Sequence, residues 1–219
     1  MHLLLITHYF PPESNAPANR AIEHAHAWVA AGHRVTIVTA APTHPSGVVY
    51  PGYANRFSRE LLGGIEVIRL ATVVAANRGV LARSLSFFSF LAAVALNRGR
   101  IPKSDVVIST SPQFFSGMAG WLLRGRGRPW VLEIRDLWPE SIVAVGAMRR
   151  NLAIRLLERI ERTAYRTADL VVTTTEAHRR HVAALAPHTP LAVIRNGVSP
   201  DLLASITVSS ACAKPWVPT

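Results

Sequence analysis

The chain has 219 residues, of which 49% are apolar and 17% charged; this is enough apolar sequence for a full core and excludes an intrinsically disordered protein. The formal net charge is +11, but only Lys103 and Lys214 are lysines, and no basic run alternates with aromatic residues, so we expect no nucleic-acid partner. The single cysteine, Cys212, excludes an intrachain disulfide framework and predicts a cytoplasmic setting.

Short apolar runs rich in β-branched residues recur along the chain and predict strands buried on both faces. They cover residues 3–7, 35–39, 65–70, 106–110, 130–134, 170–174 and 191–194. The first run is too short for a signal peptide. Helical patterns separate most of the strands, and the first of them has Asn15 as its cap, Pro17 near its first position and Gly32 after its end.

Strands and helices in alternation predict an α/β fold with a Rossmann-like, doubly wound and mostly parallel sheet. In such sheets, ligands bind beyond the carboxyl ends of the strands. Two segments interrupt the alternation. Residues 42–64 are rich in Pro and Gly and predict a long irregular loop, whereas residues 83–96 predict a buried or interfacial helix that is too short to cross a membrane.

Residues 149–168 predict a long amphipathic helix. Its apolar side is expected to contain Leu152, Leu156, Leu157, Ile160 and Ala164. The opposite side is expected to carry a basic stripe, which Glu158 and Glu161 partly balance, made of Arg155, Arg159, Arg162 and Arg166. This stripe is either a solvated surface or a site for an anionic membrane or a partner.

The loop after the first strand contains neither a GxGxxG motif nor a Walker loop, which argues against NAD dehydrogenases and P-loop NTPases. It leads into a helix N-terminus, which could hold a phosphate group. The nine histidines predict no metal site, since His178 and His181 share a helix face but have no acidic partner at a matching spacing.

The stretch EIRDLWPES, residues 133–141, places polar residues directly after a predicted central strand. Asp136 could be a helix cap, because Pro139 and Glu140 suit a first helical turn. Alternatively, Arg135 could hold a negative group while Asp136 orients a hydroxyl group or accepts its proton. The residues alone leave both interpretations open.

Several motifs occur in an order that resembles the N-terminal half of family 4 glycosyltransferases of the GT-B fold, especially those that make bacterial O-antigen, capsule and exopolysaccharide. They are HYFPPE, Arg20, GHRVT, PTHPSGVVYPGY, GIEV, Ser111-Pro112, EIRDLWPES, ADLV and RNGV. The resemblance covers residues 1–203 and implies a domain of that extent, followed by an irregular tail at 204–219.

The resemblance implies transfer of a sugar from a nucleotide donor to a saccharide or lipid-linked acceptor, with retention at the anomeric carbon and without a metal or cofactor. It assigns catalytic roles to Asp136, Arg135 and Glu140. It implies three further groups: a donor diphosphate loop with Asn15, Ala16 and Arg20, an acceptor side with His8, His44, Tyr53 and Ser111, and a domain crossover at Asn196 and Gly197.

The family's C-terminal nucleotide-sugar domain is not found in these 219 residues, so we expect a truncated protein or a split enzyme completed by a separate C-terminal half. The chain alone is then expected to be incomplete as a hexosyl-type transferase. Two alternatives stay open. One is a non-catalytic fragment that docks peripherally on the anionic inner membrane or on an acceptor, and the other is a nucleotide-sugar epimerase-like half.

Overall fold

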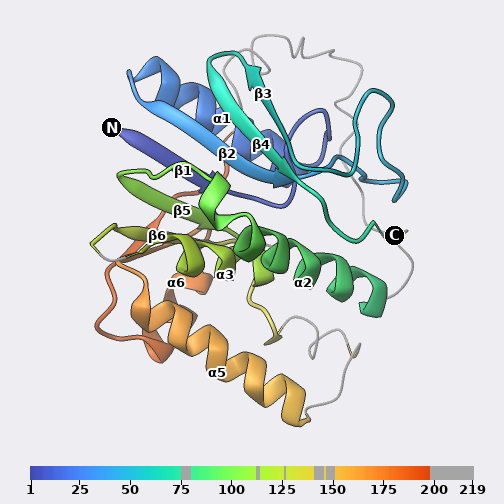
Figure 1. Ribbon diagram of the computed structural model, residues 1–219. Helices are drawn as coiled ribbons and strands as arrows, with labels where there is room; N and C mark the ends of the chain where they lie inside the picture. Colours follow the sequence, from blue (N-terminus) through green and yellow to red (C-terminus); the bar gives the residue numbers. More distant parts are fainter. Residues whose placement is uncertain (75–79, 112–113, 126, 141–145, 147–150, 198–219) are drawn as a thin grey trace, which may run out of the picture.

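A computed structural model describes residues 1–74, 80–111, 114–125, 127–140, 146 and 151–197. Its eight strands form one sheet in the order β3-β4-β2-β1-β5-β6-β7-β8 (Figure 1). Every neighbouring pair is parallel except β3–β4. The bounds are β1 His2–Ile6, β2 Arg34–Ala40, β3 Ser58–Leu62, β4 Ile65–Leu70, β5 Val106–Thr110, β6 Trp130–Ile134, β7 Leu170–Thr173 and β8 Leu191–Val193.

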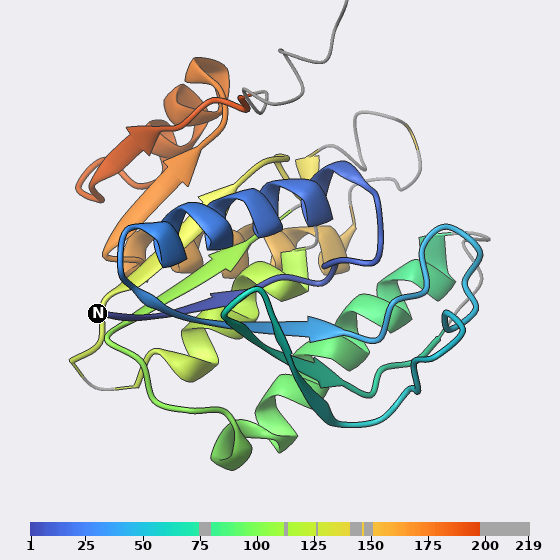
Figure 2. The same cartoon turned by 90° about the horizontal axis from the view of Figure 1, so that it is seen from above.

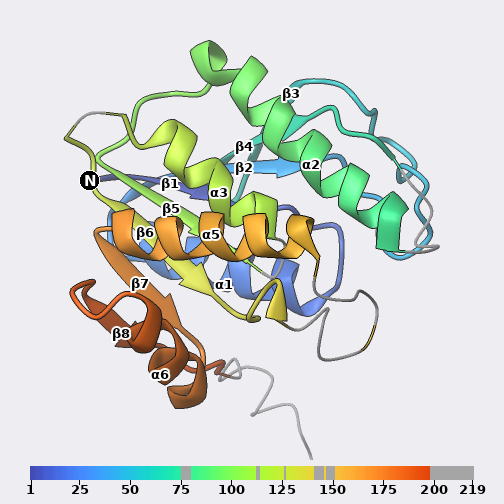
Figure 3. The same cartoon turned by 90° about the horizontal axis from the view of Figure 1, so that it is seen from below.

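The helices are α1 Ala16–Ala30, α2 Val80–Leu96, α3 Phe114–Leu123, α5 Leu152–Thr167 and α6 Glu176–Leu185, with a short 3-10 helix at Arg98–Arg100. Among these, α1 lies on one face of the sheet (Figure 2). Helices α2, α3 and α5 lie on the opposite face (Figure 3), and α6 packs against β7, β8 and α5. Helices on both faces of a mostly parallel sheet confirm the predicted Rossmann-like α/β class.

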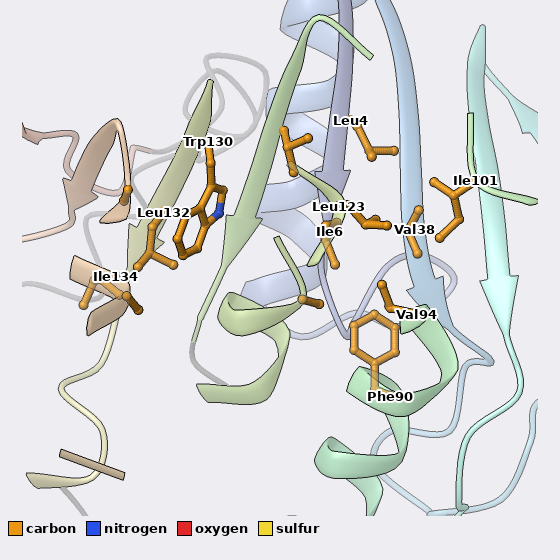
Figure 4. Packing of buried hydrophobic residues seen from close by; sticks show 14 of the residues in the cluster. Leu4, Ile6, Val38, Phe90, Val94, Ile101, Leu123, Trp130, Leu132 and Ile134 are labelled. Atoms are coloured by element: carbon orange, nitrogen blue, oxygen red, sulfur yellow. The ribbon is translucent and has the colours of Figure 1, made fainter. Parts of the chain in front are cut away.

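The core is divided between these two faces because successive residues of a strand point to opposite sides. Leu4 and Ile6 of β1 pack toward α2 and α3, where they meet Phe90, Val94 and other apolar residues (Figure 4). Leu5, between them, packs toward Ala21 and its neighbours on α1. The same short strands therefore supply apolar side chains to the core on both faces of the sheet.

The seven predicted strands are present, with ends that shift by no more than one residue. The prediction of an irregular loop over residues 42–64 was wrong in its C-terminal part, since Ser58–Leu62 forms the antiparallel edge strand β3. Only two of its five residues, Leu61 and Leu62, are apolar, and both are exposed, so the strand has no buried apolar run. Gly63 and Gly64, at φ +55° and +82°, close the β3–β4 hairpin, and this Gly-Gly pair was the usable signal.

Asn15 is the cap of α1, as predicted: its Oδ1 accepts a hydrogen bond of 2.9 Å from the backbone N–H of Ala18. The C-terminal strand β8 is only half-buried, so the expectation of burial on both faces was wrong for this edge strand. The predicted apolar helix is α2, with Phe90 in the core and Leu85 and Phe88 each 54% exposed.

The buried face of α5 differs from the predicted one. Leu152 and Leu156, expected on the buried side, are 81% and 59% exposed. Ala164 is buried, as expected, but Ile154 and Tyr165 are buried as well, together with Glu161, which was expected to balance the basic stripe at the surface. The four arginines of the stripe are exposed, as predicted. The helix buries a side different from the expected one because apolar residues occur on more than one side of it.

Candidate functional site

The predicted site residues lie in the loops that follow the carboxyl ends of the strands. The ends of β5 and β6 are joined there, because the backbone N–H of Arg135 donates a hydrogen bond of 2.9 Å to Oγ of Ser111. The structure thus brings Ser111, predicted on the acceptor side, next to the turn that carries Arg135 and Asp136.

Arg135 and Asp136 are adjacent in sequence but line different cavities. Glu133 and Arg135 line a cavity beside α1, whereas Leu132, Ile134 and Asp136 line a small pocket on the α3 and α5 face. The alternation of the strand therefore extends into the turn. No ion pair between Arg135 and Asp136 is present in the described part of the chain.

Asp136 is exposed, and the described chain becomes helical only at Glu140. The alternative role of Asp136 as a helix cap concerns residues 141–145, which lie outside the described residues. Glu140 is also exposed, and its Oε2 lies 3.3 Å from Nδ1 of His181 on α6. Sequence spacing gave no sign of this contact, because Glu140 is distant from His181 in sequence but close to it in the fold.

Arg20 is 8% exposed and forms the most extensive polar contact at this edge. Its Nε and Nη2 lie 2.7 and 2.5 Å from Oε1 of Glu133. Nη1 donates a hydrogen bond of 3.0 Å to Oδ1 of Asn196, and Nη2 donates one of 3.3 Å to the carbonyl oxygen of Ile194. Arg20 therefore joins α1, β6 and the predicted crossover segment, and its assignment to a donor diphosphate loop stays a prediction.

A cavity of about 200 Å³ lies beside α1, over β5, β6 and β7. Most of its lining is apolar, and its polar side chains are Arg20, His24, Thr110, Glu133 and Arg135. Burial lowers the pKa of the Arg135 guanidinium, while Glu133 raises it. Among the described residues, the Arg135 guanidinium has no hydrogen bond or ion pair. A half-buried cation at the end of an apolar cavity can hold an anionic group.

His8 follows β1 and is 4% exposed. Burial lowers the pKa of its imidazole to about 4, so the ring is neutral at pH 7. Its ring centroid lies 4.9 Å from that of Tyr9, and the Tyr9 ring lies 5.5 Å from that of His44. Two of the predicted acceptor residues thus belong to one row of rings.

Glu13 fixes the loop that carries His44. Its Oε1 accepts hydrogen bonds of 2.9 and 2.8 Å from the backbone N–H groups of Thr43 and His44. Tyr53 lies at the other end of the loop, where the guanidinium of Arg69 is 4.8 Å from the centre of its ring. Asn15 and Ala16 form the start of α1, and Gly197 follows Asn196 at the end of the described chain.

The sequence interpretation missed the polar residues that hold this edge together, namely Glu13, Glu133, Glu161 and Tyr165. Glu161 and Tyr165 are four residues apart, so they share a face of α5, and Oε1 of Glu161 accepts a hydrogen bond of 2.5 Å from the Tyr165 hydroxyl. That spacing was the available signal. Arg20 and Glu133 are 113 residues apart, and nothing local indicates their pairing.

Neither a metal-binding cluster nor a helix able to cross a membrane is present among the described residues. No three His, Cys, Asp or Glu side chains gather there as a metal-binding group. None of the helices in the described part of the chain combines the length and the apolar character needed to cross a membrane.

A doubly wound, mostly parallel sheet with its polar residues at the carboxyl edge defines the chain as a Rossmann-like domain of the kind that binds ligands at that edge. The Glycosyl transferase 4-like domain family matches residues 15–197, and the chain belongs to this family. A stretch of 97 residues is 35% identical to a probable glycosyltransferase, WbjE, from Pseudomonas aeruginosa. That stretch covers 42% of this chain and 24% of the relative.

Solved structures of glycosyltransferases have the same fold. A sucrose-phosphate synthase from Thermosynechococcus elongatus matches 92% of this chain with a TM-score of 0.65 and 16% identity. The UGT2 protein of Phytolacca americana, in its apo form, matches 93% with a TM-score of 0.53 and 12% identity. The chain spans about half the length of both, 49% and 53% respectively. At these identities the matches show the GT-B type of fold alone.

Proposed function

We propose that this chain is the acceptor-side domain of a retaining glycosyltransferase that moves a sugar from a nucleotide-sugar donor to a saccharide or lipid-linked acceptor in surface polysaccharide synthesis. A second domain, on the same or a separate polypeptide, supplies the donor, and neither a metal nor a cofactor takes part. The observation that carries the proposal is the exposed carboxylate of Asp136 at the carboxyl end of β6.

In this proposal each polar group at the edge has a separate role. Asp136 accepts or orients the proton of the attacking hydroxyl group, which a carboxylate does efficiently when it lies within hydrogen-bond reach. Arg135 lines the cavity beside α1, where its guanidinium, which is without a partner among the described residues, is placed to hold a negative group. Ser111 holds the turn that carries both residues, because its Oγ accepts a hydrogen bond from the backbone N–H of Arg135.

Asp136→Asn tests the proposal in the enzyme that contains both domains. We expect kcat to fall by about 100-fold or more, because the amide cannot accept a proton, with little change in the free energy of unfolding. The matched control is Asp105→Asn, at an exposed aspartate that precedes β5 at the opposite edge of the sheet, and it should leave kcat unchanged. A near-normal rate for Asp136→Asn would remove its catalytic role. The chain without a donor domain should show no turnover, and normal turnover would contradict the need for that domain.

A second candidate function, peripheral docking on an anionic membrane, is favoured by the exposure of apolar residues beside the basic stripe. Leu152 and Leu156 are exposed at the start of α5, next to Arg155 and Arg159. Exposed leucines next to arginines are typical of helices that lie in a membrane interface. Both residues lie in the half of α5 that begins at the carboxyl edge, so docking there would present the edge to a lipid-linked acceptor.

Vesicle binding tests the second candidate. We expect the chain to bind vesicles that contain anionic lipid at low salt and to dissociate as salt rises, because surface charges are screened. Arg155→Glu combined with Arg159→Glu should abolish binding. The matched control is Arg56→Glu combined with Arg98→Glu, at two exposed arginines distant from α5. Equal binding by both double variants, or no binding at low salt, would contradict docking through α5.

A further inference from the structure

Helix α2 has an apolar outer side that the fold does not explain. Of its 17 residues only Arg83 is charged. The helix buries Phe90 in the core, whereas Leu85, Phe88 and Leu96 are 54%, 54% and 86% exposed. A helix that covers one face of a sheet ordinarily carries polar residues on its outer side. The exposed side chains of α2 therefore indicate an interaction beyond those in the described part of the chain.

Helix α3 extends the same apolar surface. None of its 10 residues is charged, and it packs beside α2 on the sheet face opposite α1 (Figure 3). The ring of Phe88 lies edge to face with the ring of Phe115 on α3, with 5.7 Å between their centroids. Further along α3, Trp121 is 48% exposed. Exposed apolar side chains that continue across two helices, unlike single ones, indicate a contact with a protein or a membrane.

The stretch of chain that contains both helices is also strongly basic. Between Glu66 and Glu133 the sequence has nine Arg or Lys residues and one acidic residue, Asp105. Most of the net charge of +11 therefore comes from less than a third of the chain. Asp105 itself lies before β5, where its Oδ2 accepts a hydrogen bond of 2.7 Å from the backbone N–H of His2. An excess of cations in one region favours an anionic partner.

This charge distinguishes between two candidate occupants of the surface, a second copy of the chain and a membrane. Two copies paired through α2 and α3 would bring like charges together, and neither helix has an Asp or Glu to compensate. A bilayer that contains anionic lipid carries the opposite charge and also takes up apolar side chains. Trp121, with Arg124 three residues later, has the residue types that are common at membrane interfaces. The surface therefore fits an anionic bilayer better than a second copy.

The apolar surface adjoins the predicted acceptor side. The ring of Phe87 on α2 lies 5.1 Å from the ring of His8, which follows β1. Phe88, the next residue of the helix, belongs to the exposed surface. A bilayer against α2 would therefore lie within one helix diameter, about 10 to 12 Å, of the predicted acceptor side.

We propose that α2 and α3 form an apolar anchor by which this domain enters the interface of an anionic lipid bilayer. The side chains that enter the lipid are Leu85, Phe88, Leu96 and Trp121. The proposal rests on the second candidate function, peripheral docking, and names the surface that enters the lipid. Helix α5 lies on the same face of the sheet (Figure 3), so its arginines attract the same bilayer. Attraction between charges and burial of apolar side chains together strengthen the docking.

Sedimentation with vesicles at low salt tests the anchor in the chain as it stands. The vesicles contain phosphatidylcholine and phosphatidylglycerol in equal parts. Leu85→Asp combined with Phe88→Asp should weaken binding by about tenfold or more, because two apolar side chains are no longer transferred from water into lipid. Leu96→Asp changes a side chain that makes little contact with the fold, and it should weaken binding by about threefold. Vesicles of phosphatidylcholine alone should bind the wild type about tenfold more weakly.

The matched control is Leu61→Asp combined with Leu62→Asp, at two exposed leucines of β3, which changes the charge equally. Gly64, in the turn after them, lies beside Val29 of α1 on the opposite face of the sheet, so this variant should bind like the wild type. The proposal is overturned if the α2 variants bind like the wild type, if the control loses as much binding, or if the two kinds of vesicle bind equally. It is also overturned if the free chain forms a dimer that Leu85→Asp combined with Phe88→Asp dissociates.

Two further results distinguish the anchor from the functions proposed above. Loss of binding in Arg155→Glu combined with Arg159→Glu, but not in the α2 variants, would leave docking through α5 standing and remove the anchor. No binding by the wild type would remove both. Neither result affects the Asp136 experiment, because vesicle binding involves no sugar transfer.

Discussion

Glu133 and Glu161 are both buried carboxyl groups at the same edge of the sheet, with 7% and 5% of their surfaces exposed, but they lie on opposite faces. Glu133, on the α1 face, accepts two close contacts from the guanidinium of Arg20. Glu161, on the α5 face, has a phenol as its hydrogen-bond partner. A buried carboxylate needs a cation or must keep its proton. The first is therefore a fixed ion pair, and the second responds to pH.

The largest expected change in stability comes from removing Arg20, the cation that pairs with Glu133 on the α1 face. Arg20→Met leaves Glu133 buried without its ion-pair partner, so we expect a loss of about 3 to 5 kcal/mol in the free energy of unfolding. Urea unfolding at pH 7 measures it. The control is Arg34→Met, whose guanidinium lies 3.4 Å from Glu66 with a side chain that is 66% exposed, and it should cost less than about 1 kcal/mol. Equal losses would show that burial does not distinguish the two pairs.

The second test measures how stability changes with pH on the α5 face. The pKa of Glu161 is about 7 in the folded protein against 4.5 for an ordinary glutamate, so the folded state binds more protons between these values. Stability from this group is fully present below pH 4.5 and is lost as pH rises through 7, by about 3 kcal/mol in all. Urea unfolding at several pH values should show this loss in the wild type relative to Glu161→Gln.

The comparison with Glu161→Gln is needed because His8 acts in the opposite direction. Its pKa is about 4 in the folded protein, below the ordinary value of 6.5, so its contribution is lost as pH falls from 6.5 to 4. In the wild-type profile alone, the opposite contributions of Glu161 and His8 to the free energy of unfolding therefore partly cancel. A constant difference between wild type and Glu161→Gln from pH 4.5 to 8 would show that the pKa of Glu161 is not raised in the folded protein.

The third test weakens the phenol partner. Tyr165→Phe keeps the buried ring but removes its hydroxyl group, and we expect a loss of about 1 to 2 kcal/mol. Because the Tyr165 hydrogen bond lowers the pKa of Glu161, its removal should move the pH-dependent loss of stability upward. Unfolding at pH 6, 7 and 8 measures both effects. A downward movement would contradict the assigned direction of the hydrogen bond.

The smallest test compares the two helices that carry these contacts. Asn15 and Asn151 cap α1 and α5, with hydrogen bonds of 2.9 and 3.0 Å to the backbone N–H groups of Ala18 and Ile154. Replacing either with alanine should cost about 1 kcal/mol, independent of pH. A much larger effect for Asn15→Ala would indicate that the Arg20 contact depends on the first turn of α1. Thermal unfolding of both variants provides the comparison.

Much of the fold could be predicted because its signals are local. A buried strand such as Ile65–Leu70 is an apolar run, and Asn15 and Pro17 mark the start of α1 within three residues of one another. For the candidate site, the sequence predicted only its location, in the loops that follow the strands. The buried face of α5 was not, because leucines at 152 and 156 and an isoleucine at 154 suit different faces, and packing against the sheet selects Ile154.

The sequence by itself determined the seven strands other than β3, the cap of α1 and the position of EIRDLWPES at the carboxyl edge, because burial and hydrogen bonding within a few residues decide these features. The tertiary structure decided the chemistry of that edge. It separates Arg135 and Asp136 into different cavities, pairs Arg20 with Glu133 across 113 residues and leaves Glu161 with a phenol as its hydrogen-bond partner. The physical reason is that the cost of burying a charge depends on which distant groups surround it, and no stretch of sequence specifies them.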